Sequence, residues 1–431
     1  KYKPYEMRNF WFIIYNSFIV PALWLGFRIY GLFNYKVRQG FKGRRGLFRK
    51  LNKSLSHFNT GNKRVLIHCS SLGEYQQAIP IIEEMQGMEL DIVVSFFSPS
   101  GFENSKIPFP EIVKTYLPFD SNKNAKRFLS IGKFDTIIFM RYDLWFNLVY
   151  EAKRRKISMI IANARLDEKD IFWIVPGLNS FKRTLYNMAD TAFVIDEEDR
   201  DNYSRYLDTD KTQVVMVGDS KYERVYAAST RKLDEGIFEK KIIEGKKVFV
   251  IGSSWKDDED MILPALDKIC SVESEIFTFL VPHEPKEKKI DIIEKTIQEK
   301  YKNLSSIRFS NIENYSGENL VIVDRIGILM GLYSIAYISY VGGGLKSGLH
   351  NILEPAIFNM PVFFANKVKN SDEDVMLLRA GCGKVVDDTR SFYRNFRTIL
   401  KDRELHDSMA RGCRFVFEGS LGTAKKIVES I

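Results

Sequence analysis

Short apolar runs recur along the chain from about residue 63, and stretches with the apolar spacing of amphipathic helices separate them. This alternation is typical of parallel sheets whose strands are joined by crossover helices. The rhythm breaks at residues 224–245, which are charged and poor in apolar runs. The predicted strands are residues 64–69, 91–97, 134–140, 157–162, 191–195 and 213–218 before this break, and 246–252, 278–282, 319–324, 336–343, 361–365 and 383–388 after it.

The pattern predicts an α/β protein with two Rossmann-like domains that face each other across a cleft. Ligands in such folds bind at the carboxyl ends of the strands. We expect a first domain at residues 54–223, a linker at 224–245 and a second domain at 246–431. The 431 residues suffice for two or three domains with sizeable cores. The four cysteines are scattered without the spacing of a zinc site or a disulfide framework, which indicates a reducing compartment.

The net charge of +9 is concentrated near the N-terminus. Residues 10–27 are uncharged and rich in aromatic side chains, and residues 36–53 then carry basic residues and no acidic one. The apolar stretch is at the lower limit of what spans a bilayer, and Pro21 interrupts it. We therefore expect residues 1–53 to associate with a membrane, the apolar part lying in its plane and the basic part on anionic headgroups. The alternatives are a buried helix with a solvated basic loop and, less favoured, a cleaved signal peptide, because the positive charge follows the apolar part.

The segment VGGGLKSGLHNILEP, residues 341–355, places a glycine-dense turn before a predicted helix. Its glycines allow the backbone to approach an anion closely, and free N–H groups near Asn351, at the predicted helix start, supply donors. Glu354, one turn into the helix, can accept two hydrogen bonds from a ribose diol. The segment thus predicts a nucleotide site, and the alternative is an ordinary strand-to-helix turn. The turn's leading glycines are Gly342, Gly343 and Gly344.

Small polar residues follow the first two predicted strands. Ser71, Gly73 and Glu74 lie at the first strand-to-helix junction, where the carboxylate is a candidate general base. Its alternative role is that of a first-turn glutamate stabilised by the helix dipole. After the second strand, a turn formed by Ser98, Ser100 and Gly101 either binds an anion or caps a helix.

The second predicted domain has two similar junctions. Ser253 and Ser254 follow one strand, and His283 and Glu284 follow the next, so either pair can contact a substrate. An ordinary surface histidine is the alternative for His283. The acidic run at residues 257–260 is explained more simply as the first turn of a helix than as a metal site.

Taken in order, these segments resemble the 3-deoxy-D-manno-oct-2-ulosonic acid (Kdo) transferases of lipopolysaccharide assembly. HCSSLGEYQQAIPII is similar to that family's His-x-x-Ser-x-Gly-Glu segment, and SPSGFE to its Thr/Ser-Pro-Ser-Gly turn. YLPFD, NARL, VGDSKYERV, GSSWKDDE and the segment ending in HNILEPA then follow in family order. The resemblance extends from about residue 10 to about residue 390.

The resemblance implies a GT-B glycosyltransferase that moves Kdo with inversion from CMP-Kdo to a lipid A precursor. It implies an acceptor-binding first domain, a donor-binding second domain, no metal and no cofactor. It also implies work at the cytoplasmic face of the inner membrane, on anionic lipid. Glu74 would be the catalytic base, supported by Ser71, Gly73, Ser98, Ser100, Gly101 and Asp143. Donor binding would fall to Ser253, Ser254, His283, Gly342, Gly343, Gly344, His350, Asn351 and Glu354.

Two segments depart from the family pattern. Where the family has Glu-Thr-Glu-Leu-Trp-Pro-Asn, this chain has RYDLWFN, so that Arg141 and Tyr142 replace the first two residues and Asp143 keeps the acidity of the third. Where the family has Pro-Arg-His, this chain has Pro282, His283 and Glu284. An arginine that would contact the donor is therefore missing, and we expect a divergent branch with the same activity.

Two other functions stay open. A GT-B enzyme that uses a UDP-sugar would share the cleft and the glycine turn, and a preference for UDP over CMP would indicate it. A nucleotide-binding protein at the membrane surface without catalysis is the second, although the Gly73-Glu74 pair argues against it. Nucleic-acid binding is least favoured, because the basic cluster adjoins an apolar segment.

Overall fold

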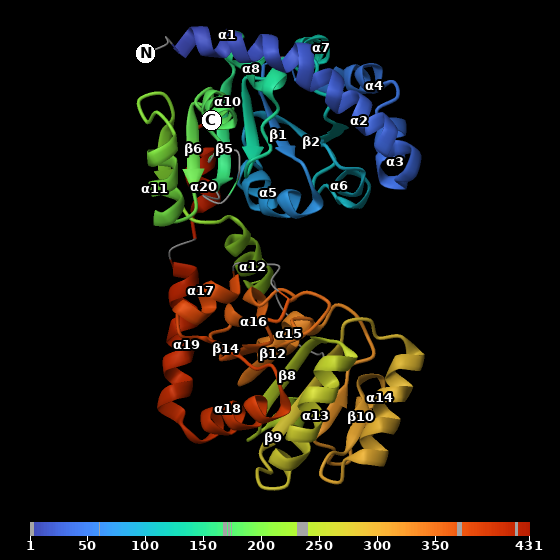
Figure 1. The fold of residues 1–431 in the computed structure, drawn as a ribbon. Helices are drawn as coiled ribbons and strands as arrows, with labels where there is room; N and C mark the ends of the chain where they lie inside the picture. Colours follow the sequence, from blue (N-terminus) through green and yellow to red (C-terminus); the bar gives the residue numbers. More distant parts are fainter. Residues whose placement is uncertain are drawn as a thin grey trace. The chain divides into compact units, whose positions relative to one another are not determined.

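The computed structural model describes residues 4–59, 61–166, 170, 173, 175–230, 240–368, 373–418 and 421–431. The chain forms two compact units (Figure 1). Unit 1 comprises Lys1–Arg224 and Ser420–Ile431, and unit 2 comprises Val225–Gly419. Each unit is built on one seven-stranded sheet in which every pair of neighbouring strands is parallel.

The sheet of unit 1 has the strand order β3-β2-β1-β4-β5-β6-β7. Its strands are β1 (Lys63–Cys69), β2 (Leu90–Phe96), β3 (Val113–Tyr116), β4 (Thr136–Met140), β5 (Ser158–Ala164), β6 (Thr191–Val194) and β7 (Gln213–Met216). The helices after the N-terminal segment are α5 (Leu72–Glu84), α6 (Pro99–Asn104), α7 (Asn122–Gly132), α8 (Phe146–Arg154), α10 (Pro176–Tyr186), α11 (Glu197–Tyr206) and α20 (Thr423–Val428), and α12 (Lys221–Thr230) crosses the boundary between the units.

The sheet of unit 2 has the strand order β10-β11-β9-β8-β12-β13-β14. Its strands are β8 (Lys247–Ser254), β9 (Ile276–Pro282), β10 (Ser306–Arg308), β11 (Leu320–Ile322), β12 (Ile338–Val341), β13 (Val362–Phe364) and β14 (Gly383–Val385). Its α-helices are α13 (Lys256–Cys270), α14 (Glu287–Lys300), α15 (Leu329–Tyr333), α16 (Leu353–Ala356), α17 (Glu373–Arg379), α18 (Thr389–Lys401) and α19 (Arg403–Glu418). Short 3₁₀ turns occur at Leu55–His57, Lys240–Ile243 and Phe309–Asn314.

The apolar runs form strands because each central strand is buried on both faces. In β1, Leu66 packs into the core on one face of the sheet, whereas Val65 and Ile67 pack into the core on the other. In β8, Phe249 and Val250 divide between two cores in the same way. Successive side chains of a strand point to opposite faces, so helices that cover both faces require a nearly continuous apolar run.

All the predicted strands occur, with ends that differ by a few residues. The sequence did not predict β3 and β10, which lie at the edges of the two sheets. Both are short, and β3 contains Lys114 in the sequence VKTY. An edge strand needs less apolar surface than a central one, so its signal in the sequence is weak.

The chain returns to unit 1 at its C-terminus, whereas the predicted second domain extends to residue 431. Glu223 accepts hydrogen bonds from the N–H groups of Gly422 and Ala424, and Ile427 is fully buried in the core of unit 1. The predicted linker at 224–245 also differs, because its first residues continue α12. Its residues 231–239 lie outside the described part of the chain.

The N-terminal segment begins with α1 (Pro4–Ile14), a π-helical turn (Tyr15–Ile19) and α2 (Val20–Phe33), which follow one another without a break. The π turn lies just before Pro21, which has no backbone N–H to donate, and the Val20 N–H bonds to the Tyr15 carbonyl. Within the described residues, Met7–Phe33 is one helix long and apolar enough to cross a membrane by length and composition. The helices α3 (Tyr35–Gly43) and α4 (Leu47–Ser54) follow.

One face of this long helix packs on unit 1. Asn16 and Asn147 of α8 exchange two side-chain hydrogen bonds, at 2.8 and 3.0 Å. The Trp11 indole N–H donates to the Ser180 hydroxyl of α10, and Tyr15 is buried in the core of unit 1. The helix is therefore attached along its side, through polar contacts as well as apolar ones.

Arg44 differs from the other basic residues of the run at 36–53. Its guanidinium donates to the carbonyls of Leu117, Phe97 and Gly40 at 2.7 to 3.1 Å. Burial lowers the pKa of Arg44 to about 10. Arg44 thus joins α3 to the ends of β2 and β3, whereas the exposed members of the run are Lys36, Arg38, Lys42, Arg45, Arg49, Lys50 and Lys53.

We expect Arg44→Met to lower the free energy of unfolding of unit 1 by about 3 kcal/mol, because three carbonyls lose a charged donor. Arg45→Met is the matched control, since Arg45 is exposed and its replacement should change stability by less than about 0.5 kcal/mol. Urea denaturation followed by tryptophan fluorescence measures both changes. Equal stability of the two variants would contradict the structural role of Arg44.

Candidate active site

Each sheet reverses its strand order at one place, between β1 and β4 in unit 1 and between β8 and β12 in unit 2. Open parallel sheets bind ligands outside the carboxyl ends of the strands that flank such a reversal. Most of the predicted site residues follow these strands, whereas Ser98, Ser100 and Gly101 follow β2 and His283 follows β9. Ser71, Gly73 and Glu74 follow β1 and Asp143 follows β4, while Ser253 and Ser254 end β8 and the glycines follow β12. The predicted residues thus form one group in each unit.

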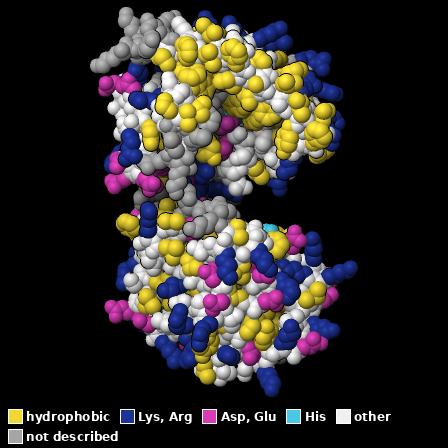
Figure 2. Space-filling model, in the orientation of Figure 1, with side chains coloured by type: hydrophobic (Ala, Val, Ile, Leu, Met, Phe, Trp, Pro, Cys, Tyr) yellow, Lys and Arg dark blue, Asp and Glu magenta, His cyan; other side chains and the backbone are white. Residues whose placement is uncertain are grey.

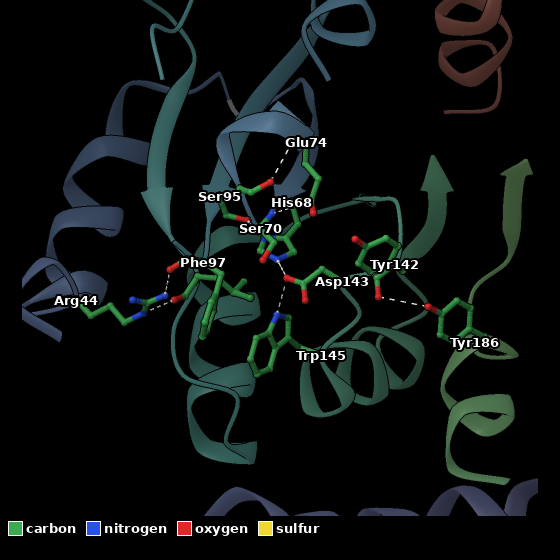
Figure 3. Close-up of polar contacts among 12 residues, drawn as sticks. Arg44, His68, Ser70, Glu74, Ser95, Phe97, Tyr142, Asp143, Trp145 and Tyr186 are labelled. Atoms are coloured by element: carbon green, nitrogen blue, oxygen red, sulfur yellow. Dashed lines mark hydrogen bonds and ion pairs between the residues drawn. The ribbon is translucent and has the colours of Figure 1, made fainter. Parts of the chain in front are cut away.

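Glu74 lies in the first turn of α5 and is 7% exposed (Figure 3). The Ser71 side chain caps this helix and accepts from the Glu74 N–H at 3.3 Å, and the Glu74 carboxylate accepts from the Ser70 N–H. Burial raises the pKa of Glu74, and the charge of Asp143 adds to this rise, while the hydrogen bond from Ser70 opposes it. Gly73 has open space around it, because a Cβ would meet only the Ser71 hydroxyl, at 3.8 Å.

A second carboxylate, Asp143, joins a hydrogen-bonded chain beside Glu74 (Figure 3). His68 is fully buried in β1, and its Nδ1 is 2.9 Å from the Ser95 hydroxyl while its Nε2 is 3.1 Å from the Asp143 carboxylate. The Trp145 indole N–H donates to the same carboxylate oxygen at 3.1 Å. Burial acts to raise the pKa of Asp143, but the hydrogen bonds with His68 and Trp145 lower it below its usual value.

The site of unit 1 therefore contains two neighbouring carboxylates whose pKa values are shifted in opposite directions. That of Glu74 is raised and that of Asp143 is lowered. Such a pair is suited to proton transfer, because the group with the raised pKa accepts a proton more readily while the other stays ionised.

The turn after β2 caps a helix. The Ser98 hydroxyl accepts from the Gly101 N–H at 3.0 Å at the start of α6, and Ser100 lies 3.5 Å from Ser98 between hydroxyl oxygens. The Ser98 N–H donates to the Ser70 carbonyl, which ties this turn to the loop that carries Glu74. A Cβ on Gly101 would lie 3.2 Å from the Leu72 backbone nitrogen, so glycine permits this close packing.

Two segments that the sequence suggested only by resemblance also meet in unit 1. Asn163, of the segment NARL, donates to Asp219 and Ser220 of the segment VGDSKYERV at 2.9 and 2.8 Å. The Ser220 hydroxyl donates to the Gln77 carbonyl of α5 at 2.6 Å, and the Gln77 side chain accepts from Arg141. This network connects α5, the helix of Glu74, to the end of β5 and to the loop after β7.

The glycine turn of unit 2 is packed against protein backbone. A Cβ on Gly342 would lie 2.4 Å from the Ser253 carbonyl oxygen, and one on Gly344 would lie 1.7 Å from that of Ala365. Gly343 has φ of +96°, a conformation that favours glycine, and a Cβ there would lie 2.2 Å from the Gly348 carbonyl oxygen. The fold of unit 2 thus requires these glycines irrespective of any ligand.

Asp258 holds this turn in place. Its carboxylate accepts from the N–H groups of Trp255 and Gly343, at 2.9 and 3.0 Å, and from the Tyr340 hydroxyl at 2.7 Å. It therefore connects the start of α13 to β12 and to the glycine turn. The sequence predicted only a first-turn acid here, because nothing in the acidic run distinguishes the one carboxylate that is 1% exposed.

The predicted helix after the glycine turn is short, since α16 spans only Leu353–Ala356. The Asn351 side chain accepts from the Leu353 N–H at 3.1 Å and donates to Glu354 at 3.1 Å. The sequence predicted a helix start with free N–H donors near Asn351, and a short helix does begin there, but the Leu353 N–H is already bonded to the Asn351 side chain. A four-residue helix has little dipole, and the Asn351 side chain already satisfies one of its donors.

His350 lies just before this helix, and its ring contacts the rings of Trp255 and His283. Its Nε2 is 3.0 Å from the Trp255 indole nitrogen, and its ring stacks on that of His283 with centroids 4.3 Å apart. The Ser254 hydroxyl donates to Glu259 at 2.8 Å, and Ser253 has φ of +52°. Among the residues that the structure describes, no group of three or more His, Cys, Asp or Glu side chains is placed to hold a metal ion.

Comparison with known proteins supplies the family. The family profile described as 3-deoxy-D-manno-octulosonic-acid transferase (kdotransferase) matches residues 39–224. A 3-deoxy-D-manno-octulosonic acid transferase of Haemophilus influenzae is 26% identical over 376 residues, which are 85% of this chain and 86% of that protein. The chain belongs to the Kdo transferase family. The predicted family is thereby confirmed.

Two further relatives place the chain among known architectures. A bifunctional glycosyltransferase/methyltransferase of Fusobacterium nucleatum is 27% identical over 352 residues, which are 79% of the present chain. The chain spans about half of that relative, 53% of its length. The structure of UDP-GlcNAc 2-epimerase from Neisseria meningitidis bound to UDP-GlcNAc is 17% identical with a TM-score of 0.56, and covers 85% of this chain and 99% of its own. The two seven-stranded units and this fold similarity confirm the predicted GT-B class.

We expect Gly344→Ala to destabilise unit 2 by more than about 3 kcal/mol or to prevent its folding, because the new methyl group would overlap the Ala365 carbonyl. Gly177→Ala in α10 is the control, since a Cβ there meets nothing within 4 Å. Thermal unfolding by circular dichroism measures both. A Gly344→Ala protein as stable as the control would show that this turn is not constrained by packing.

Proposed function

We propose that the chain transfers Kdo with inversion from CMP-Kdo to a lipid A precursor of the lipid IVA type, at the cytoplasmic face of the inner membrane. The observation that carries this proposal is the carboxylate pair of Glu74 and Asp143 at the strand reversal of unit 1, in a member of the Kdo transferase family. The acceptor then belongs to unit 1 and the donor to unit 2.

In the proposed reaction Glu74 is the general base. It takes the proton from an acceptor hydroxyl as that oxygen forms a bond to the anomeric carbon of Kdo. The bond from that carbon to the phosphate oxygen breaks, and CMP leaves with the electron pair. A single displacement of this kind inverts the configuration at the anomeric carbon.

The surroundings of Glu74 suit this role. Burial and the charge of Asp143 raise the pKa of Glu74 by more than the backbone hydrogen bonds from Ser70 and Ser71 lower it. Asp143 stays ionised through His68 and Trp145 and maintains the negative charge that strengthens the base. We assign Ser71, Gly73, Ser98, Ser100 and Gly101 to the support of these loops.

On the donor side, Glu354 would bind the ribose and His350 with His283 the phosphate. Glu354 is already oriented by Asn351, so a ribose diol would add to an existing hydrogen-bonded pair. Ser253, Ser254 and the glycines would shape the floor of the site, and no metal or cofactor is part of the proposal. Because α16 is short, we assign the leaving phosphate to side chains more than to the helix end.

The N-terminal helix is proposed to lie in the membrane plane. Its outward face carries apolar side chains that are 50 to 82% exposed, and Figure 2 shows hydrophobic side chains gathered over this part of unit 1, with Lys and Arg beside them. A contiguous apolar surface of this kind is typical of a membrane contact. The opposite face is occupied by contacts such as Asn16 with Asn147, so lipid cannot surround the helix. The exposed side chains include Phe10, Ile13, Phe18, Trp24, Leu25, Ile29, Leu32 and Phe33.

We expect Glu74→Gln to lower turnover by about 100-fold or more, while CMP affinity stays within a few-fold, because the amide cannot accept the proton. Wild-type turnover should fall as the pH drops below the raised pKa of Glu74, since the protonated acid is not a base. The assay incubates the protein with CMP-Kdo and a tetraacylated lipid A precursor and reads product masses. Glu84→Gln, at the exposed end of the same helix, is the matched control. Near-normal turnover of Glu74→Gln would exclude the assigned base.

The second candidate function is that of a GT-B enzyme that uses a UDP-sugar, and it is tested by nucleotide binding together with the product assay. The epimerase of similar fold was solved with UDP-GlcNAc, so a UDP-sugar is the competing donor class. Calorimetric titration with CMP and UDP separates the two. Tighter binding of UDP, with no Kdo product, would favour the alternative.

The basic run supplies a prediction on membrane binding. Replacing its exposed members, Lys36, Arg38, Lys42, Arg45, Arg49, Lys50 and Lys53, by Gln should weaken binding to anionic vesicles by up to about 1 kcal/mol per charge and remove most of its salt dependence. Arg44 is kept, because its guanidinium is bonded to backbone carbonyls.

The control neutralises exposed lysines of unit 2 and compares the loss per charge removed. Vesicle co-sedimentation at low and high salt measures both proteins. Unchanged binding at low salt would show that the run is solvated surface only. The control lysines are Lys268, Lys288, Lys300 and Lys302.

A further inference from the structure

Three rings form a compact stack at the carboxyl ends of the central strands of unit 2. The rings of Trp255 and His350 are nearly parallel, with an interplanar angle of 7°, and a hydrogen bond of 3.0 Å joins Trp255 Nε1 to His350 Nε2. His283 stacks on both, with ring centroids 4.8 Å from Trp255 and 4.3 Å from His350. The third ring thus lies over the junction between the first two.

The hydrogen bond fixes the tautomer of His350. An indole nitrogen carries a hydrogen and can only donate, so Nε2 of His350 must accept. A neutral imidazole that accepts at Nε2 carries its hydrogen on Nδ1. His350 is therefore a neutral ring that offers an N–H donor at Nδ1.

Protonation of His350 would bring two N–H groups face to face. The bond to Trp255 would be lost, and a positive ring would lie 4.3 Å from His283. Burial, followed by the neighbouring His283, lowers the pKa of His350. Both effects keep His350 neutral.

His283 is exposed to solvent. In the described part of the chain, charged groups on the neighbouring loops are paired, as Lys346 is with Asp257 at 2.5 Å. Glu284 pairs with Lys286 at 2.7 Å, and Asp258 is bonded within the glycine turn. Lys289 lies 5.6 Å from the Trp255 ring centroid and 3.9 Å from Glu259.

We propose that Trp255 is a positioning residue that holds His350 as a neutral Nδ1–H donor, so that His283 alone takes up a proton when the stack binds the phosphate of a nucleotide. The phosphate part rests on the proposed function, whereas the tautomer is a property of the protein without ligand. A cation at His283 stacks favourably on the Trp255 ring and on a neutral imidazole. The binding of each phosphate is then coupled to the uptake of one proton by His283.

The first experiment determines the state of His350 without ligand. Long-range ¹H–¹⁵N correlation spectra of ¹⁵N-histidine-labelled protein distinguish the two tautomers and the imidazolium, and the chain has only 5 histidines to assign. We expect His350 to stay in the Nδ1–H form from about pH 6 to about pH 8, and to titrate in this range in Trp255→Phe, which keeps the aromatic ring but removes the donor. An Nε2–H tautomer or an imidazolium in the wild type would overturn the proposal.

The second experiment measures CMP affinity against pH by calorimetry. The ratio of wild-type to His283→Gln affinity cancels the titration of the CMP phosphate itself. This ratio should be about tenfold near pH 6 and fall toward unity near pH 8.5, because the proton on His283 is lost. His283→Arg should bind CMP with a permanent charge and show no such decline.

A ratio that does not depend on pH would overturn the role of His283. Absence of CMP binding by the wild type would instead overturn the proposed donor, and the tautomer measurement would still decide whether Trp255 positions His350.

Discussion

Both units of this protein depend on hydrogen bonds to buried carboxylates near the carboxyl ends of central strands. A parallel sheet covered on both faces leaves polar loop groups in a dry environment, where each must find a partner. In unit 2, Asp258 meets this need by accepting three hydrogen bonds, from Trp255, Tyr340 and Gly343. In unit 1, Glu74 accepts from the Ser70 N–H next to β1. The same device therefore fixes the loop geometry on which each candidate site is built.

The number of donors around a carboxylate distinguishes a structural role from a chemical one. Asp258 is bonded on both oxygens, so it has little capacity left for a substrate proton. Asp143 is held by His68 and Trp145, which lower its pKa, whereas burial dominates at Glu74 and raises its pKa. Of the two carboxylates at this site, Glu74 therefore has the higher affinity for a proton. It also explains why a short acidic stretch in a sequence does not reveal which member is chemically active.

Most of the fold could be predicted because burial of the central strands on both faces produces long apolar runs. The two strands that were not predicted, β3 and β10, lie at sheet edges, where less apolar surface is required. The strand-end positions of Glu74 and the glycines followed from the same pattern, whereas Asp143 was indicated only by the resemblance to the family. Partners distant in sequence could not be predicted. His68 reads as part of an apolar run, yet its ring joins Ser95 to Asp143. Trp255 and His350 are 95 residues apart, and no local spacing indicates their hydrogen bond.

The N-terminal segment shows the same limit of prediction from sequence. Its charge and its length can be read from the sequence, but the roles of its residues depend on contacts that only the structure shows. Arg44 is one of several basic residues in a row, but its guanidinium bonds to three carbonyls and stabilises the fold. The helix Met7–Phe33 is long enough to cross a membrane, but Asn16 exchanges two hydrogen bonds with Asn147 and Tyr15 is buried in the core. A spanning orientation would have to break these contacts and expose the Asn147 amide. The proposed orientation along the surface would keep the contacts of one face while the apolar face reaches lipid.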